Sequence, residues 1–346
     1  MADPLWLMTA VTVAAVTLFN FTNGFHDAAD MVATAIASRA MRSETAIGIV
    51  LVFTFLGPFL AGLAVADTVG TFVELSGVGA LRAQSIVAGA LMAAITYNLL
   101  TWRLGYPSSS SNSLAGGLVG AGLGLLGNDA IHWGIQALSE GRFEGVVKVV
   151  AGLFLSPVFG FIAGYFIMKL ILWLFRRATA RVRALFVASQ YVSIAWLGFS
   201  HGANDAQKGM AVIGMMLLAG GYSEQFVIPL WAVLLCTTAI TVGTMFGGWN
   251  IIKTMGFGIY RIRVVHAVAN QVGSALVNTV ATALGAPTST TQVVTATLLG
   301  NGAAEKPAHV RWRTAAGIVA GWFMNVPASM LLGAFYAWLL VTLLGG

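Results

Sequence analysis

Charged residues are scarce in this sequence. Asp, Glu, Lys and Arg together make up 9% of its 346 residues, whereas a soluble domain usually carries about a quarter. The composition therefore argues against a soluble globular protein. The single cysteine, Cys236, excludes a disulfide within the chain and a cysteine-rich metal site. Signatures of nucleotide hydrolysis, serine hydrolases and zinc proteases are lacking in the context that each needs, so we expect neither an enzyme nor a cofactor.

Most of the sequence is apolar instead. Hydrophobic residues make up 58% of the chain, and the mean hydropathy is +0.84. A helix needs about 20 apolar residues to cross a hydrocarbon core about 30 Å thick, and the alternation typical of a membrane β-barrel is lacking. We therefore expect an all-α polytopic membrane protein whose first run is a retained helix, because it lacks the basic start of a signal peptide. The candidate runs are 5–21, 46–66, 86–100, 146–175, 226–248 and 314–344.

Two motifs recur in the same order. The stretch FTNGFHDA at 21–28 returns as FSHGANDA at 199–206, so that Asp27 aligns with Asp205 at an offset of 178 residues. The stretch NLLTWRLGYPSSSSN at 98–112 returns as NTVATALGAPTSTTQ at 278–292, at an offset of 180. Two motifs at nearly one offset predict two homologous halves. We place the halves at 1–175 and 184–346, with the first motif at 23–30 and 201–208.

The basic loops predict the orientation. Residues 176–183 read RRATARVR and link the halves with four arginines, and short basic loops stay in the cytoplasm. This assignment puts both termini outside and makes the hairpins 82–128 and 263–303 enter from opposite faces. The halves then have inverted topology with discontinuous helices, an organisation typical of secondary transporters. Whether the hairpins re-enter or cross fully stays open. The stretches 39–42, 253–263 and 306–313 are expected inside, and 67–74, 129–144 and 220–225 outside.

Each hairpin carries a proline followed by hydroxyls. Gly and Pro end one helix, and Ser or Thr caps the next, whose free N–H groups and dipole form an anion site. Two such tips could enclose a tetrahedral oxyanion; the alternative is that these small residues only pack helices or bond to their own helix. The expected anion-binding residues are Ser108, Ser109, Ser110, Ser111, Asn112, Thr288, Ser289, Thr290, Thr291, Gln292 and Lys208.

The first motif supplies the opposite polarity. An ionisable residue within the membrane costs at least about 2.5–3.5 kcal/mol on insertion scales, so Asp27 and Asp205 are functional candidates. Carboxylate and amide oxygens suit Na⁺, Mg²⁺ or a proton. We also expect the motif's glycine to end the first half of a helix, so that each aspartate caps the second half, a role compatible with cation binding. The expected cation-binding residues are Asn23, Asp27, Asp30, Asn98, Asn204, Asp205 and Asn278, with Na⁺ placed at Asp27 and Asp205.

Other polar residues give weaker signals. Lys208 lies one turn after Asp205, where it could meet the anion or pair with that carboxylate. Arg103 precedes Pro107 by four residues and could contact substrate, pair with a carboxylate or extend to the membrane surface. His132 and His266 belong to neither motif, and we treat them as ordinary polar residues.

At these residues the chain resembles the inorganic phosphate transporter (PiT) family of bacterial type. NGFHDAAD at 23–30, HGANDAQKGM at 201–210 and the two Pro-hydroxyl tracts carry the resemblance. It implies an inverted-repeat symporter that moves phosphate with Na⁺ or H⁺, either as the free anion or as a metal–phosphate complex, and a homodimer in the cell's inner membrane. It also implies that the matching aspartates, asparagines and hairpin hydroxyls bind cation and phosphate.

The chain departs from the family pattern at three positions. Asp30 stands where the family usually has Asn, and Asn112 and Gln292 stand where the tracts commonly end in His. Two close carboxylates tend to share a proton or recruit a cation, so the coupling ion stays open between Na⁺ and H⁺. The substrate stays open between phosphate and sulfate. A carboxylate near the anion favours phosphate, because a protonated phosphate donates a hydrogen bond and sulfate does not.

Two hypotheses with a different kind of function remain. A passive anion channel would not need carboxylates inside the anion site, and a membrane scaffold or receptor would need neither motif in duplicate. The net charge of +6 follows from basic cytoplasmic loops, so a nucleic-acid partner is not expected.

Overall fold

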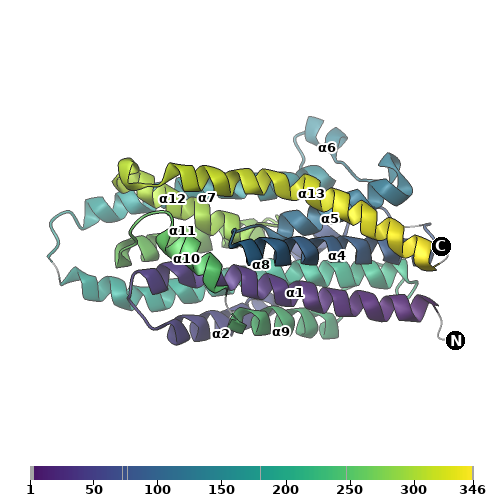
Figure 1. The fold of residues 1–346 in the computed structure, drawn as a ribbon, viewed down its shortest axis with the longest axis horizontal. Coiled ribbons are helices and arrows are strands. Elements are labelled where there is room, and N and C mark those ends of the chain that lie inside the picture. Colours follow the sequence, from purple (N-terminus) through teal and green to yellow (C-terminus); the bar gives the residue numbers. More distant parts are fainter. Residues whose placement is uncertain (1–3, 72, 76, 180, 247, 345–346) are drawn as a thin grey trace.

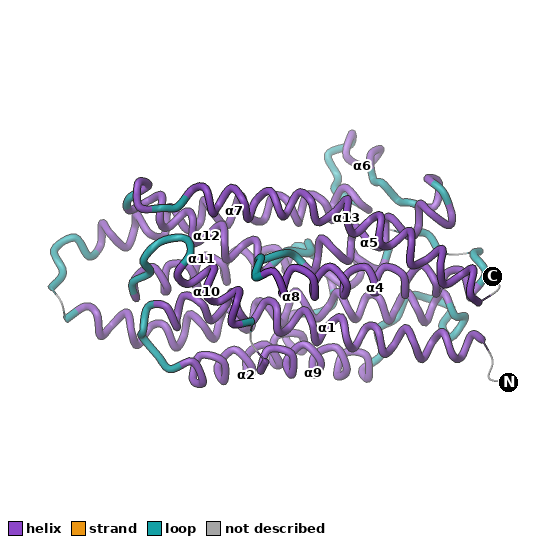
Figure 2. The backbone as a smooth tube through the Cα atoms, viewed as in Figure 1, coloured by secondary structure: helices purple, strands orange, loops and turns teal. Residues whose placement is uncertain are grey.

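The protein is an elongated bundle of helices (Figures 1 and 2). The computed structural model describes residues 4–71, 73–75, 77–179, 181–246 and 248–344, so Ala180 of the basic link and the residues at both ends lie outside it. Within these ranges, β pairing is confined to one isolated bridge between Val73 and Ile131. The first half contains α1 (Pro4–Ala37), α2 (Ser43–Ala61), α3 (Ala64–Gly70), α4 (Ala80–Leu104), α5 (Ser110–Leu126), the short η1 (Asn128–Ala130), α6 (Ile135–Ser139) and α7 (Gly145–Leu174). The second half contains α8 (Val182–Ala219), α9 (Leu230–Phe246), α10 (Trp249–Phe257), α11 (Val264–Ala283), α12 (Thr290–Glu305), the short η2 (Pro307–His309) and α13 (Trp312–Leu344).

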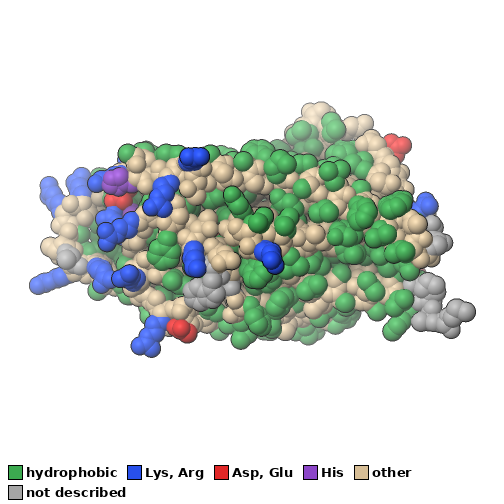
Figure 3. Space-filling view, viewed as in Figure 1, with side chains coloured by type: hydrophobic (Ala, Val, Ile, Leu, Met, Phe, Trp, Pro, Cys, Tyr) green, Lys and Arg blue, Asp and Glu red, His purple; other side chains and the backbone are tan. Residues whose placement is uncertain are grey.

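Several helices are long and apolar enough to cross a membrane. By length and composition, α1, α2, α4, α7, α8 and α13 qualify among the described residues, and α9 with α10 forms a further pair bent by 73°. Large apolar side chains such as Trp6, Phe166 and Leu331 are exposed on the flanks, and Figure 3 shows hydrophobic side chains along much of the bundle. The expected all-α polytopic membrane fold is confirmed.

The first motif does not interrupt its helix, which corrects our expectation of a break there. Helices α1 and α8 run continuously through Asp27 and Asp205, so neither aspartate caps a half-helix. The motif glycines serve close packing instead. A Cβ on Gly24 would lie 2.0 Å from the Ile240 carbonyl oxygen of α9, and one on Gly202 would lie 2.0 Å from the Thr54 carbonyl oxygen of α2. Glycine lets these helices approach backbone to backbone.

The discontinuities fall between the helices of each hairpin. Gly105 ends α4 with φ of 71°, and Gly285 follows α11 with φ of 64°, a left-handed conformation that glycine adopts without strain. After each proline, a serine caps the next helix: the Ser109 hydroxyl accepts from the Asn112 amide at 3.0 Å, and the Ser289 hydroxyl accepts from the Gln292 amide at 3.3 Å. The Gly–Pro–hydroxyl pattern therefore predicted both turns and both caps.

Helices of one half pack against helices of the other half. Hairpin helix α5 lies against α13, with Gly120 next to the Met330 carbonyl, and α12 lies against α7, with Gly164 next to the Thr297 carbonyl. Likewise α1 packs on α9 and α8 packs on α2. Each of these pairs joins one helix from either half. The halves thus interlock around a shared interior, while their inverted topology stays a prediction.

Basic side chains gather at one end of the bundle. Figure 3 shows Lys and Arg concentrated at the left-hand end, where α7 gives way to α8 in Figure 1. Helix α1 begins and α13 ends at the opposite end (Figure 1).

Candidate functional site

The hydroxyl tips and the first motifs come together in the interior. All the expected anion- and cation-binding residues are buried, and Figure 2 shows loop segments midway along the bundle. The two tips touch directly, because the Ser111 hydroxyl donates to the Thr288 carbonyl oxygen at 2.9 Å. The repeat of Pro-hydroxyl tracts therefore builds one site from both halves.

Thr291 connects the second hairpin to the first copy of the first motif, at 23–30. Its hydroxyl oxygen lies 2.6 Å from an Asp27 carboxylate oxygen and 2.7 Å from an Asp30 carboxylate oxygen. A hydroxyl carries one proton, so Thr291 can donate to one of these two carboxyl groups at a time. Among the described residues, neither carboxylate has a Lys or Arg partner; the nearest basic groups are the imidazoles of His26 and His201, at 3.8 and 3.9 Å from Asp27.

At the second copy of the first motif, the Asp205 carboxylate has more partners than Asp27 or Asp30. The Thr290 hydroxyl donates to Asp205 at 2.5 Å, and the Nδ1 atom of His201 lies 3.1 Å from the same carboxylate oxygen. Lys208 forms an ion pair with Asp205 and also donates to the Ser111 hydroxyl at 2.5 Å and the Thr288 carbonyl at 2.6 Å. Asp205 therefore has the buried counter-charge that Asp27 and Asp30 lack.

The asparagines hold the tips in place. Asn204 accepts from the Thr288 amide at 3.0 Å and donates to the Ala286 carbonyl. Asn278 accepts from the Thr288 hydroxyl, and Asn23 accepts from the Ser110 hydroxyl at 2.6 Å. These amides bond protein groups, so their structural part is positioning the tips.

Among the residues that the structure describes, buried polar atoms without a hydrogen-bond partner are most numerous around the first copy of the first motif. In and around its copy at 23–30 they belong to Asn23, His26, Asp30, Asn98 and Asn112, whereas around its copy at 201–208 they belong to His201 and Gln292. Such an atom costs about 1–3 kcal/mol in a protein interior, and unpaired groups in a native structure call for an explanation. The side of the site around Asp27 and Asp30 is therefore the side with unused binding capacity.

Within the described part of the chain, two sets of ligand atoms could hold a cation. His26, Asp27 and Asp30 form one set, and Asp27, His201 and Asp205 form the other, with the potential ligand atoms of each set within 4.8 Å of one another. Carboxylate and hydroxyl oxygens suit Na⁺ or Mg²⁺, while the imidazole nitrogens also suit transition metals. Asp27 belongs to both sets.

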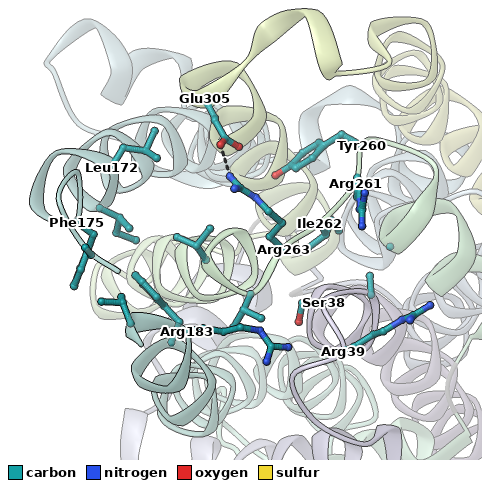
Figure 4. A pocket seen from close by; sticks show the side chains of 18 of the residues that line it. Ser38, Arg39, Leu172, Phe175, Arg183, Tyr260, Arg261, Ile262, Arg263 and Glu305 are labelled. Atoms are coloured by element: carbon teal, nitrogen blue, oxygen red, sulfur yellow. Dashed lines mark hydrogen bonds and ion pairs between the residues drawn. The ribbon is translucent and has the colours of Figure 1, made fainter. Parts of the chain in front are cut away.

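The cavities show that the tips are closely packed. The cavity bordered by Ser111, Lys208 and Pro287 has a volume of about 10 Å³, about the room that one water needs. A cavity of about 970 Å³ lies elsewhere, at the basic end between Arg39, Arg183 and Arg263 (Figure 4). The large cavity contains none of the motif residues.

The remaining candidates lie outside the site. Arg103 is exposed at the end of α4, and His132 is exposed. His266 lies at the basic end, where its Nε2 atom is 2.6 Å from a carboxylate oxygen of Glu305. Glu305 also pairs with Arg263. Neither Arg103 nor these histidines contributes a contact to the paired tips.

The expected site residues did not include His26, His201 or Asn325. Asn325 of α13 donates to the Ser109 carbonyl at 2.8 Å and accepts from the Ser113 hydroxyl at 2.8 Å. It stabilises the cap of the first hairpin from the other half. Its signal was a lone amide within the apolar run 314–344, two residues before Pro327.

Comparisons with known proteins agree with the motifs. The profile described as "Phosphate transporter family" matches residues 23–333. A probable low-affinity inorganic phosphate transporter of Rhizobium meliloti is 38% identical over 324 residues, 93% of each chain. One of Bacillus subtilis is 33% identical over 96% of this chain and 97% of its own. A solved structure titled "The sodium-dependent phosphate transporter" has the same fold, with a TM-score of 0.80, 23% identity and coverage of 97% of this chain and 99% of that one.

Proposed function

The chain belongs to the phosphate transporter family, whose members are transporters and not enzymes, and on that premise we propose that it imports inorganic phosphate by symport with a cation, Na⁺ or H⁺. The observation that carries this proposal is the hydroxyl of Thr291, which contacts the carboxyl groups of both Asp27 and Asp30. It joins the expected anion tip to the expected cation site by one hydrogen bond.

The hydroxyl tips support an anion site. Ser109 and Ser289 cap helices whose first N–H groups face the tips, and a helix N-terminus favours an anion. The hydroxyls of Ser110, Ser111 and Thr290 add donors without charge. Because the tips are packed against each other, we propose that they move apart to admit phosphate.

The carboxylates support phosphate over sulfate. The hairpin hydroxyls reach Asp27, Asp30 and Asp205 at 2.5–2.7 Å, so an anion at these hydroxyls lies beside carboxylates. Phosphate with one proton can donate to such a carboxylate, whereas sulfate at neutral pH only accepts. Sulfate is the alternative substrate of the same site.

The charges support cation coupling. The buried site holds three carboxylates, of Asp27, Asp30 and Asp205, against one ammonium, of Lys208. Bringing an anion into this surplus of negative charge is unfavourable unless positive charge enters as well. A cation at Asp27 and Asp30 would also compete for the oxygens that now accept from Thr291, which frees its O–H to donate to phosphate. Cation and phosphate then bind cooperatively, and each raises the affinity of the other.

The neighbouring structure bears on the choice of cation. Its title names a sodium-dependent phosphate transporter, and we propose Na⁺ at the site of Asp27 and Asp30, with H⁺ or a divalent metal carried with phosphate as alternatives. The cation would be taken up and released as cargo.

Topology completes the proposal. The basic end faces the cytoplasm by the charge rule, which puts the start of α1 and the end of α13 outside the cell. The halves 1–175 and 184–346 would be inverted repeats that alternate access to the shared site. Location in the inner membrane and a homodimer rest on family resemblance.

Competition between anions tests the substrate. Purified protein in liposomes should take up labelled phosphate under an inward Na⁺ or proton gradient, and excess sulfate should leave that uptake nearly unchanged. Strong inhibition by sulfate, together with gradient-driven sulfate uptake, would assign the alternative substrate. Equal uptake of both anions without any response to either gradient would favour a passive channel.

A further inference from the structure

Asp30 and Lys208 occupy equivalent positions with opposite charge. Each lies three residues after its motif aspartate, Asp27 or Asp205. Each contacts the fourth hydroxyl of the hairpin from the other half: Asp30 accepts from Thr291 at 2.7 Å, and Lys208 donates to Ser111 at 2.5 Å. The same place in the two halves is therefore a carboxylate in one and an ammonium in the other.

The ammonium of Lys208 is surrounded by oxygen atoms. Its partners are the Asp205 carboxylate, the Ser111 hydroxyl and the Thr288 carbonyl, so each of its three N–H donors has an acceptor. A carboxylate, a hydroxyl and a backbone carbonyl are also the ligand types that hard metal cations take in proteins. The side chain is buried, so no bulk water shares in the coordination.

The equivalent position in the first half has ligand oxygens but no positively charged Lys or Arg side chain among the described residues. Asp27 and Asp30 face Thr291, and one Asp30 carboxylate oxygen has no partner among the described residues. The two halves thus present comparable oxygen sets, and one of them is already neutralised by the chain itself.

We propose that the Lys208 ammonium is a tethered cation that fills the second of two equivalent cation sites, so that the chain takes up a mobile cation at Asp27 and Asp30 alone. This inference rests on the proposed cation-coupled function and assigns Lys208 to the cation side of the site. It departs from our expectation that Lys208 binds phosphate, because the Lys208 ammonium is already ion-paired with the buried Asp205 carboxylate.

Two reciprocal substitutions test the proposal without transport. Lys208→Asn removes the tethered charge and leaves Asp205 in need of a cation. At pH 8 and without phosphate, Na⁺ should raise the thermal unfolding temperature of this variant by several degrees more than that of the wild type, relative to equal choline chloride. The double variant Asp205→Asn with Lys208→Asn should lose this extra response, because it keeps no carboxylate there.

Asp30→Lys makes the opposite change. It should install a tethered cation beside Asp27, so the Na⁺-dependent rise in unfolding temperature seen for the wild type should disappear while the protein remains folded. If Lys208→Asn cannot be obtained as a folded protein, Asp30→Lys still tests the proposed tethered cation.

The outcomes separate this inference from the proposed function. A wild type without any Na⁺ response would count against Na⁺ at Asp27 and Asp30, yet an Na⁺ response gained by Lys208→Asn would still support the tethered cation. A folded Lys208→Asn protein with the wild-type Na⁺ response would overturn the inference. So would an Asp30→Lys protein that keeps the full response.

Discussion

Thr291 and Asp27 lie 264 positions apart in the chain, yet the Thr291 hydroxyl is 2.6 Å from the Asp27 carboxylate. The bond joins the tip of one hairpin to the motif helix of the other half. It places the expected anion donors and the expected cation ligands within one hydrogen bond of each other, which is the arrangement that coupled binding requires.

Replacing Thr291 by valine should weaken the coupling between cation binding and phosphate binding. Hydrogen bonds to charged groups contribute about 1.5–3 kcal/mol, so phosphate uptake should fall by about tenfold or more at limiting cation. Thr297→Val is the matched control, since the Thr297 hydroxyl bonds the Val293 carbonyl of its own helix. Uptake rates of the two variants in liposomes give the comparison, and equal losses in both would show that Thr291 has no special part.

Neutralising the motif aspartates should uncouple the transporter. Asp27→Asn and Asp205→Asn remove the carboxylates that face Thr291 and Thr290, and each should abolish gradient-driven phosphate uptake while the protein still folds. Size-exclusion chromatography and thermal unfolding check the fold of each variant. Normal uptake by both variants would remove these residues from the mechanism.

Asp30 is the carboxylate that the family pattern does not predict, and its removal should have a milder effect. Asp30→Asn leaves Asp27 to bind the cation alone, so the cation concentration for half-maximal phosphate uptake should rise several-fold with uptake preserved. Glu44→Gln is the control, because Glu44 is an exposed carboxylate at the start of α2. An unchanged cation dependence in Asp30→Asn would exclude Asp30 from cation binding.

The serine caps should contribute measurably to stability. Ser109→Ala and Ser289→Ala each remove an acceptor for the first turn of a hairpin helix, a loss of about 1 kcal/mol that should appear as a lower thermal unfolding temperature. Ser274→Ala should be neutral or stabilising by comparison, because the buried Ser274 hydroxyl has no hydrogen-bond partner among the described residues. Similar behaviour of all three variants would contradict the capping interpretation.

Gly24 should tolerate no side chain. Gly24→Ala would put a Cβ 2.0 Å from the Ile240 carbonyl oxygen, whereas a Cβ on Gly48 of α2 meets nothing within 4 Å. We expect Gly24→Ala to lower the yield of folded protein severely and Gly48→Ala to leave it unchanged or stabilised by about 0.5–1 kcal/mol. Detergent-extracted yield and thermal unfolding measure both. A normally folded Gly24→Ala protein would mean that α1 and α9 can separate at little cost.

Local chemistry explains what could be predicted from the sequence. Gly105 and Gly285 need only their own backbone freedom, and Ser109 and Ser289 bond amides three residues away, so each turn follows from its own few residues. The long apolar runs predict spanning helices for the same reason.

Long-range packing explains what could not be predicted. Gly24 was expected to end a helix. Its actual role is to let α9, more than 200 residues later in the chain, approach α1 closely. The pairing of Thr291 with Asp27 and the contribution of Asn325 to the first hairpin depend on how the halves interlock. No local pattern contains that information.

Uphill accumulation of phosphate tests the central claim most directly. Liposomes containing the purified protein would start with equal phosphate inside and outside, and an inward cation gradient would then be imposed, first of Na⁺ and separately of protons. The account predicts that internal phosphate rises above the external concentration under at least one gradient, and that an ionophore that collapses the gradient abolishes the rise. Phosphate that equilibrates across the membrane but never exceeds the external concentration under either gradient would contradict symport and indicate a passive pore.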